Sequence, residues 1–155
     1  MRRLVRRLAL LSTFVLVCVP LVASVAVART ISCTGGGDCV GTPKHDFMRG
    51  GPGDDRMVGR DGDDRMLGGD GQDVLKGKGG SGTLDGGEGD DRAEGGSGRD
   101  TASGGVGDDI IRGGSHGGTN DGVHDALDCG DGVDTVYYVE NQDSISDCEI
   151  FNPPE

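Results

Sequence analysis

The sequence predicts an all-β solenoid built from nine-residue repeats, and two observations support this fold class. First, residues 41–112 divide into eight nonads without an insertion, and each nonad opens on glycine. Second, the sixth place is aspartate in all nonads but one, and the eighth place is always apolar. A fixed period of this kind indicates stacked repeats, which bury a continuous core between neighbouring units.

The places of the nonad have separate roles. Glycines at the first, second and fourth places allow positive φ and a close approach of backbone carbonyls, as a tight loop around an ion requires. The last three residues, such as RMV at 56–58, suit a very short strand whose middle side chain is buried. Two nonads then form one turn with two strands and two loops. Residues 18 apart are therefore expected to stack about 4.8 Å apart.

This stacking places the sixth-place aspartates in two columns. Two carboxylates about 5 Å apart repel each other by roughly 3 kcal/mol at an effective dielectric constant of 20. A calcium ion between them reverses the sign, because calcium takes six to eight oxygens from carboxylates and carbonyls, whereas magnesium demands stricter geometry and retains its water. The candidate ligands are Asp55, Asp73, Asp91 and Asp109 in the first column, and Asp46, Asp64 and Asp100 in the second.

The two columns are expected to bind calcium unequally. Every loop of the first column has glycine at both the second and fourth places. In the second column Gly82 replaces an aspartate, and three second-place glycines are replaced, among them by Arg60 and Lys78. We expect up to three calcium sites in the first column and one, between Asp46 and Asp64, in the second.

The eighth-place side chains are too few and too small to offset the entropy of ordering some seventy residues. Ion binding is therefore expected to supply part of the folding free energy. Extracellular calcium modules bind at about 10⁻⁴ to 10⁻³ M, so folding would follow export from the cell.

The nonads match the pattern G-G-x-G-x-D-x-U-x, as in GGPGDDRMV at 50–58. In this the chain resembles a small secreted member of the RTX, or hemolysin-type, calcium-binding repeat family. The resemblance implies a parallel β-roll in which each Ca²⁺ lies between stacked loops, held by sixth-place aspartates and loop carbonyls. A flexible acidic spacer is the alternative, but it would not need an apolar residue at every eighth place.

The N-terminal segment, residues 1–28, is interpreted as a secretory signal peptide. It has four arginines, an apolar run from Leu8, and a small-residue cleavage pattern at Ala26-Val27-Ala28. A retained membrane anchor is the alternative interpretation. Because this segment holds four of the 15 basic residues and no acid, cleavage leaves 11 basic against 27 acidic residues, a formal charge of −16. Such a chain attracts cations rather than nucleic acid or an anionic membrane.

The flanks of the array are expected to be caps. Residues 29–40 form the N-terminal cap, and residues 113–155 hold a seven-residue insert, two degenerate nonads and the C-terminal cap. Four cysteines remain in an oxidising compartment, which favours disulfides. We expect Cys33–Cys39 and Cys129–Cys148, which would staple the two ends of the solenoid, while the two other connectivities stay open.

No enzyme motif is recognised. The histidines, His45, His116 and His124, are interpreted as surface loop residues, and no nucleophile elbow, zinc-protease or phosphate-loop pattern occurs. The predicted function is therefore secreted, non-enzymatic calcium binding. The alternative is an adhesion or surface-interaction protein whose outer strand face binds a protein or glycan, although the outward places show no regular ladder of threonine or aromatic residues.

Overall fold

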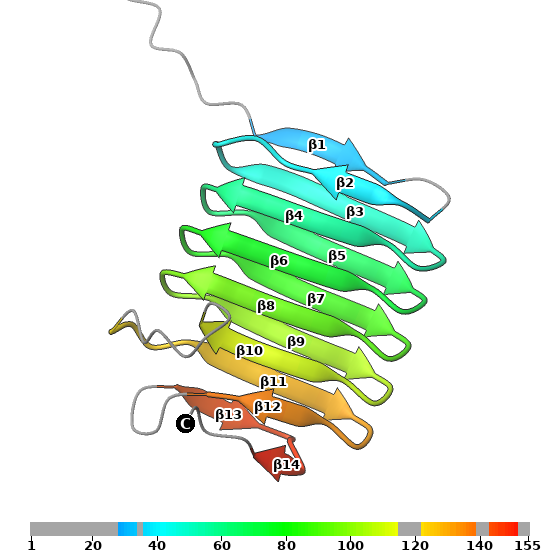
Figure 1. The fold of residues 1–155 in the computed structure, drawn as a ribbon, viewed down its shortest axis with the longest axis vertical. Coiled ribbons are helices and arrows are strands. Elements are labelled where there is room, and N and C mark those ends of the chain that lie inside the picture. Colours follow the sequence, from blue (N-terminus) through cyan, green and yellow to red (C-terminus); the bar gives the residue numbers. More distant parts are fainter. Residues whose placement is uncertain (1–27, 34–35, 115–121, 139–142, 152–155) are drawn as a thin grey trace, which may run out of the picture.

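The computed structural model describes residues 28–33, 36–114, 122–138 and 143–151 of the 155-residue chain. The regular secondary structure within these ranges consists of strands (Figure 1). The described residues include no helix that is long and apolar enough to cross a membrane. The expected signal peptide and His116 lie outside the described residues, apart from residue 28.

The strands form two parallel seven-stranded sheets, which we name the odd and the even sheet after their strand numbers (Figure 1). The odd sheet contains β1 (Arg29–Ser32), β3 (Asp46–Pro52), β5 (Arg65–Asp70), β7 (Thr83–Glu88), β9 (Thr101–Val106), β11 (Ala126–Asp131) and β13 (Ser144–Ser146). The even sheet contains β2 (Asp38–Val40), β4 (Arg56–Asp61), β6 (Val74–Gly79), β8 (Arg92–Ser97), β10 (Ile110–Gly114), β12 (Thr135–Tyr137) and β14 (Ile150–Phe151).

The chain alternates between the two sheets, so each strand pairs with the strand two further along. Met48 pairs with Met66, and Met57 pairs with Leu75, both at a separation of 18 residues. This register confirms the predicted parallel β-solenoid with two nonads per turn. The same register gathers the loops at two edges of the solenoid. We name as the first edge the one that holds the loops after odd strands, and as the second edge the one that holds the loops after even strands.

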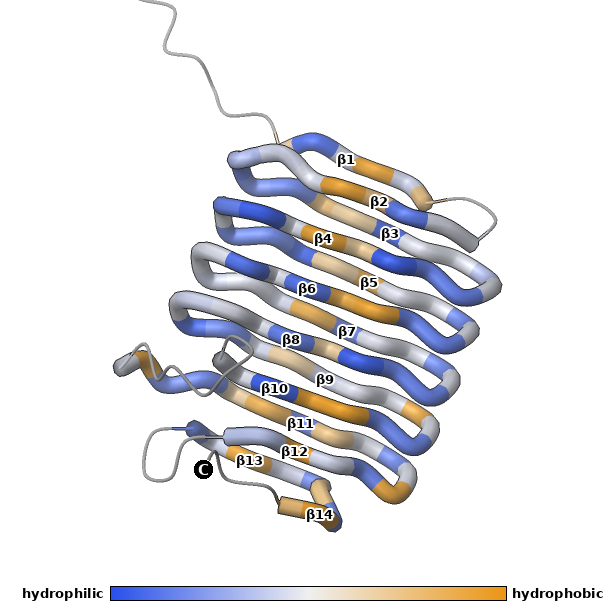
Figure 2. Tube along the Cα trace, in the orientation of Figure 1, coloured by the Kyte–Doolittle hydropathy of each residue, from blue (hydrophilic) through white to orange (hydrophobic). Residues whose placement is uncertain are grey.

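The core is a double stack of eighth-place side chains between the sheets. Apolar residues alternate with hydrophilic ones along the strands, and hydrophilic residues also occupy many of the loops (Figure 2). The eighth-place residues are all at most 1% exposed: Met48, Met57, Met66, Leu75, Leu84, Ala93, Ala102 and Ile111. Their burial confirms that the middle residue of each strand faces inward.

The strands are longer than the three residues that the sequence suggested. Seven of the fourteen strands in the described residues contain six residues, as in β4, and extend from the seventh place through the glycines of the next nonad. Gly69 pairs with Gly87 in the ladder, because glycine backbones without Cβ atoms can approach and hydrogen-bond across turns. The loops therefore shrink to the fourth to sixth places, and the aspartate stands where each loop meets the next strand.

Parallel pairing continues on both sides of residues 41–112. β1 and β2 form a turn above the array, and β11 to β14 continue it below. β11 pairs with β9 at a separation of 25 residues, which accommodates the seven-residue insert. Disulfides join Cys33 to Cys39 and Cys129 to Cys148, so each end of the solenoid carries one covalent link, as expected.

Candidate metal-binding edges

The sixth-place aspartates line the interior of both edges. Each is at most 3% exposed, although the loops that carry them are on the surface. Asp55, Asp73, Asp91 and Asp109 stack on the first edge, and Asp46, Asp64 and Asp100 stack on the second. The structure therefore brings all seven predicted site residues into the two expected columns.

One carboxylate oxygen of each of these aspartates except Asp46 caps the turn above. The Oδ1 atom of Asp73 accepts a hydrogen bond of 2.7 Å from the backbone N–H of Asp55, and Asp91 does the same for Asp73. On the second edge Asp64 accepts from the N–H of Asp46 at 2.8 Å. These hydrogen bonds satisfy backbone N–H groups that have no partner in the strand ladder, so the aspartates also have a structural role.

The second carboxylate oxygen of most of these aspartates is buried and has no hydrogen-bond partner among the described residues. This holds for the Oδ2 atoms of Asp55, Asp64, Asp73, Asp91, Asp109 and Asp134. A buried anionic oxygen without a partner is strongly unfavourable, so it demands a proton or a cation.

A backbone carbonyl oxygen lies near the Oδ2 atoms of Asp55, Asp64, Asp73, Asp91 and Asp109. A Cβ atom added to Gly86 would collide with both the Oδ2 atom of Asp91 and the carbonyl oxygen of Gly104. Gly68 is placed in the same way between Asp73 and the carbonyl oxygen of Gly86. The first-place glycine therefore keeps open a small space in which a carboxylate and a carbonyl oxygen converge.

The raised pKa values of three aspartates indicate that the two columns lack a compensating positive charge. Burial raises the pKa of Asp91 from 3.8 to about 7, and those of Asp64 and Asp109 to about 6. The charges of neighbouring aspartates add to the effect, and the amide hydrogen bonds oppose it. Near neutral pH these carboxylates are therefore poised between protonation and cation binding.

The donor set fits calcium. Within the described residues, no three His, Cys, Asp or Glu side chains come together as a ready-made metal cluster. An ion between turns would thus combine one or two carboxylates with carbonyl oxygens, a donor set typical of calcium. Aspartates of adjacent turns, with the carbonyls beside the first-place glycines, are the groups that would hold it.

The two edges differ in charge. The first-edge loops 50–55, 68–73, 86–91, 104–109 and 129–134 contain eleven acidic residues and no basic one. The second-edge loops include Lys44, Arg60, Lys78 and Arg99, and Gly82 interrupts the column. Asp46 also differs, because its Oδ2 atom accepts hydrogen bonds from the backbone N–H and the hydroxyl of Thr42, at 2.6 and 2.9 Å.

The columns continue beyond the predicted residues. Asp134 accepts from the N–H of Asp109 at 2.7 Å, and Asp125 accepts from that of Asp100 at 2.9 Å. Both hold the sixth place of a degenerate nonad, so the repeat pattern itself could have identified them. Glu149 continues the first column, because its Oε2 atom accepts a hydrogen bond of 3.0 Å from the backbone N–H of Asp134. The two residues are 15 apart in the sequence instead of 18, so the nine-residue period could not identify Glu149. The longer glutamate side chain makes up for the shorter separation.

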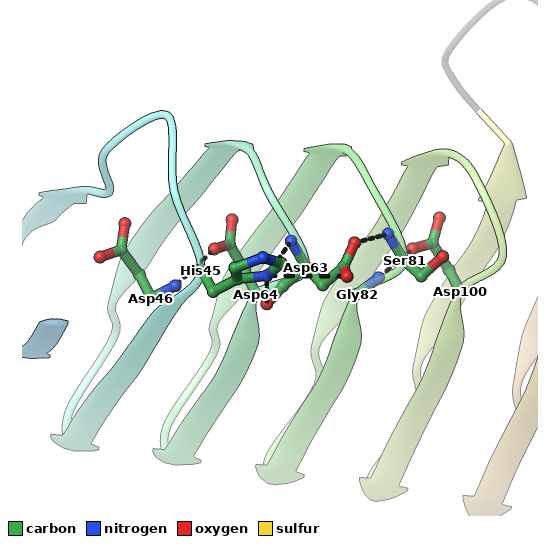
Figure 3. Close-up of polar contacts among 7 residues, drawn as sticks. All are labelled: His45, Asp46, Asp63, Asp64, Ser81, Gly82 and Asp100. Carbon is green, nitrogen blue, oxygen red and sulfur yellow. Dashed lines mark hydrogen bonds and ion pairs between the residues drawn. The ribbon is translucent and has the colours of Figure 1, made fainter. Parts of the chain in front are cut away.

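The exposed fifth-place residues form a second row beside the carboxylate column (Figure 3). The Nδ1 atom of His45 accepts a hydrogen bond of 3.0 Å from the N–H of Asp63, and Asp63 accepts one of 2.7 Å from the N–H of Ser81. Asp63 thus lies between the histidine and the serine. A Ser-His-Asp triad needs the histidine in the middle, so this row is not a catalytic triad.

Comparison with protein-family models decides the family. The model of the RTX calcium-binding nonapeptide repeat, which spans four copies, matches residues 40–75, 49–84 and 85–115. The array belongs to the RTX calcium-binding nonapeptide repeat family. Neither the curated proteins nor the solved structures include a significant match to this chain.

RTX repeats are calcium-binding repeats, which agrees with the donor chemistry of the two columns. The matched residues cover all seven predicted aspartates. They end before Asp125, Asp134 and Glu149, so the RTX pattern alone does not include the lower part of either column.

Proposed function

We propose that this protein is a secreted, non-enzymatic calcium-binding protein whose RTX roll folds when Ca²⁺ enters its edges. The observation that carries the proposal is the column of buried carboxylate oxygens that have no hydrogen-bond partner among the described residues, above all at Asp73, Asp91 and Asp109. Each needs a positive charge, and each has a carbonyl oxygen beside it. When bound, calcium supplies that charge and cross-links successive turns.

The first edge is the principal site in this proposal. Its column runs from Asp55 to Asp134 without a gap, and its loops carry no basic side chain. Ions are expected between the pairs Asp55/Asp73, Asp73/Asp91 and Asp91/Asp109. The pair Asp109/Asp134 adds a further position that the sequence analysis did not include.

The second edge is expected to bind fewer ions. Gly82 removes a carboxylate from both positions that it would share with Asp64 and Asp100. Two positions with both carboxylates remain: the pair Asp46/Asp64, where Thr42 already occupies one oxygen of Asp46, and the pair Asp100/Asp125. The interrupted column therefore divides the molecule into a strong and a weak edge.

Secretion is supported by the sequence and by the disulfides. Residues 1–28 have the pattern of a signal peptide, and the bonds Cys33–Cys39 and Cys129–Cys148 suit an oxidising compartment. An N-terminus at Arg29, found by sequencing the protein recovered from culture medium, would support cleavage. A retained segment 1–28 would support the membrane-anchor alternative.

The experiment that tests the function is calorimetric titration of calcium-free protein with Ca²⁺, with Mg²⁺ as the matched control. We expect saturable calcium binding at about 10⁻⁴ to 10⁻³ M, with several ions per chain, and much weaker magnesium binding because magnesium keeps its water. Equal binding of both metals, or of neither, would contradict the proposal.

A further inference from the structure

The outer surface of the even sheet carries an unusual concentration of positive charge. The alternating outward positions of β4 and β6 hold four cations and two valines, Arg56, Val58, Arg60, Val74, Lys76 and Lys78, and the one exposed acid of these two strands is Asp61 at the end of β4. We name this surface the basic face. The matching positions of β5 and β7 on the odd sheet hold one cation and one acid, Arg65 and Asp85. Neither the fold nor calcium binding requires this difference.

Two of these cations occupy strained backbone positions. Arg60 and Lys78 have φ values of 87° and 83°, in the left-handed region where the repeat pattern favours glycine. Both side chains are exposed, and neither forms an ion pair within the described residues. A glycine would adopt this backbone with less strain, so a role for the charge explains why a side chain stands there.

The basic face already accepts two carboxylates from its own chain. The Nζ atom of Lys76 lies 3.9 Å from the Oε2 atom of Glu94, whose side chain is 5% exposed. Arg56 lies 3.6 Å from Asp38 on the neighbouring strand. Carboxylates are thus the groups that this surface binds, and Arg60 and Lys78 extend it toward the second edge.

The complementary surface is present on the same molecule. The first edge exposes six acidic side chains that lie outside the buried column: Asp54, Asp70, Glu88, Asp90, Asp108 and Asp131. We name this surface the acidic edge. Asp70 and Glu88 are register partners on adjacent turns, as are Arg60 and Lys78. The acidic side chains of the acidic edge and the cations of the basic face therefore form two rows, and each row repeats at the strand spacing of about 4.8 Å.

We propose that the basic face of one molecule binds the acidic edge of a second copy, with the two solenoid axes side by side. The shared spacing favours a second copy over a foreign acidic partner, because the two rows of one protein match turn by turn. The contact is heterologous, since different surfaces meet, and it leaves one free surface at each end. It would therefore build open-ended lateral assemblies.

The net negative charge opposes association, but salt limits its reach. At about 0.15 M ionic strength the Debye length is roughly 8 Å, so distant charges are screened while contacting pairs still interact. The proposal rests on the proposed calcium-driven folding, because the rows form only in the folded roll. Calcium also reduces the net charge of each copy.

The test uses the full chain, expressed with its own N-terminal segment and purified as processed, in saturating calcium. Sedimentation velocity should show an average mass that rises with protein concentration at about 0.15 M salt and returns to the monomer near 1 M. A monomer at every concentration, with the circular dichroism spectrum of a β-fold, would overturn this inference while leaving calcium binding intact. Binding of polyglutamate by a protein that stays monomeric would likewise overturn it in favour of a foreign partner.

Paired variants identify the surfaces. Arg60→Gly with Lys78→Gly restores the glycines of the repeat pattern, and Asp70→Asn with Glu88→Gln neutralises the acidic edge. Each double variant alone should associate at least tenfold more weakly, yet an equimolar mixture should form a heterodimer, because each retains the surface that the other lacks. A mixture that stays monomeric would overturn the proposal.

The matched control is Arg49→Thr with Arg65→Thr, which removes two cations from the odd sheet. Association should be unchanged. An equal loss in the control would show that only overall charge matters and would overturn the assignment to the basic face.

Discussion

Asp91 caps Asp73 from the turn below. The Oδ1 atom of Asp91 accepts a hydrogen bond of 2.7 Å from the backbone N–H of Asp73, while its Oδ2 atom has no partner among the described residues. The same side chain therefore holds two turns together and presents a buried negative charge. Each sixth-place aspartate of the first edge has this double role, a structural hydrogen bond and a buried negative charge.

Asp73→Ala should weaken calcium-induced folding more than Asp100→Ala. Each change removes one hydrogen bond of 2.7 Å, which the aspartate accepts from the backbone N–H of Asp55 in the case of Asp73 and of Gly82 in the case of Asp100. The loss of this hydrogen bond is therefore matched between the two variants. Only Asp73 contributes to two complete ion positions, because Asp100 stands next to Gly82. We expect the calcium midpoint to differ by roughly tenfold between the variants, or about 1.4 kcal/mol. Equal midpoints in the same titration would show that the columns are wrongly assigned.

Gly82→Asp should have opposite effects with and without calcium. Gly82 does not have a positive φ, and a Cβ there would lie 3.2 Å from both the Oδ1 atom of Asp100 and the Cδ1 atom of Leu84, so an aspartate fits after a small adjustment of these two side chains. The added carboxylate completes the second column, which should increase the number of bound ions. In chelator the same charge adds repulsion and should lower any residual structure. Calorimetry and circular dichroism measure the two effects, and an unchanged ion count would contradict the account.

Gly86→Ala should abolish calcium binding at its loop, although alanine can adopt the φ value of this position. Gly86 has no positive φ, but its Cβ would fill the space between Asp91 and the carbonyl of Gly104. Overpacking of this kind costs about 1–3 kcal/mol. Gly37→Ala is the matched control, because nothing lies within 4 Å of its Cβ. If calcium raises the melting temperature of both variants by the same amount, the space beside Gly86 is not an ion site.

Acidic pH should stabilise the calcium-free fold and weaken calcium binding. The pKa of Asp91 is raised to about 7 and those of Asp64 and Asp109 to about 6, against 3.8 for the ordinary group. The folded chain then binds more protons than the unfolded chain between about pH 4 and 7. Stability from this source is complete below 3.8 and is lost as the pH rises through 6 to 7.

Calcium must displace these protons, so the calcium midpoint should rise as the pH falls from 7.5 to 5.5. Titrations at both values, with spectra in chelator at the same pH, measure the effect. A midpoint independent of pH would indicate that the carboxylates do not bind the ion.

The nine-residue period was sufficient to predict the register, the two columns and the buried eighth place, because each follows from a spacing that repeats without insertion. It underestimated the strands, since glycines such as Gly69 and Gly87 pair across turns instead of belonging to the loops. Glu149 and the capping of backbone amides could not be predicted, because they depend on where side chains point in three dimensions.

The central claim, that calcium drives folding of the roll, is tested most directly by a calcium titration of the chelator-treated protein followed by far-UV circular dichroism. The account predicts a largely unstructured spectrum without calcium and a cooperative gain of β-structure near 10⁻⁴ to 10⁻³ M Ca²⁺. A β-spectrum and a melting temperature that stay the same in chelator and in calcium, at pH 7.5, would contradict it.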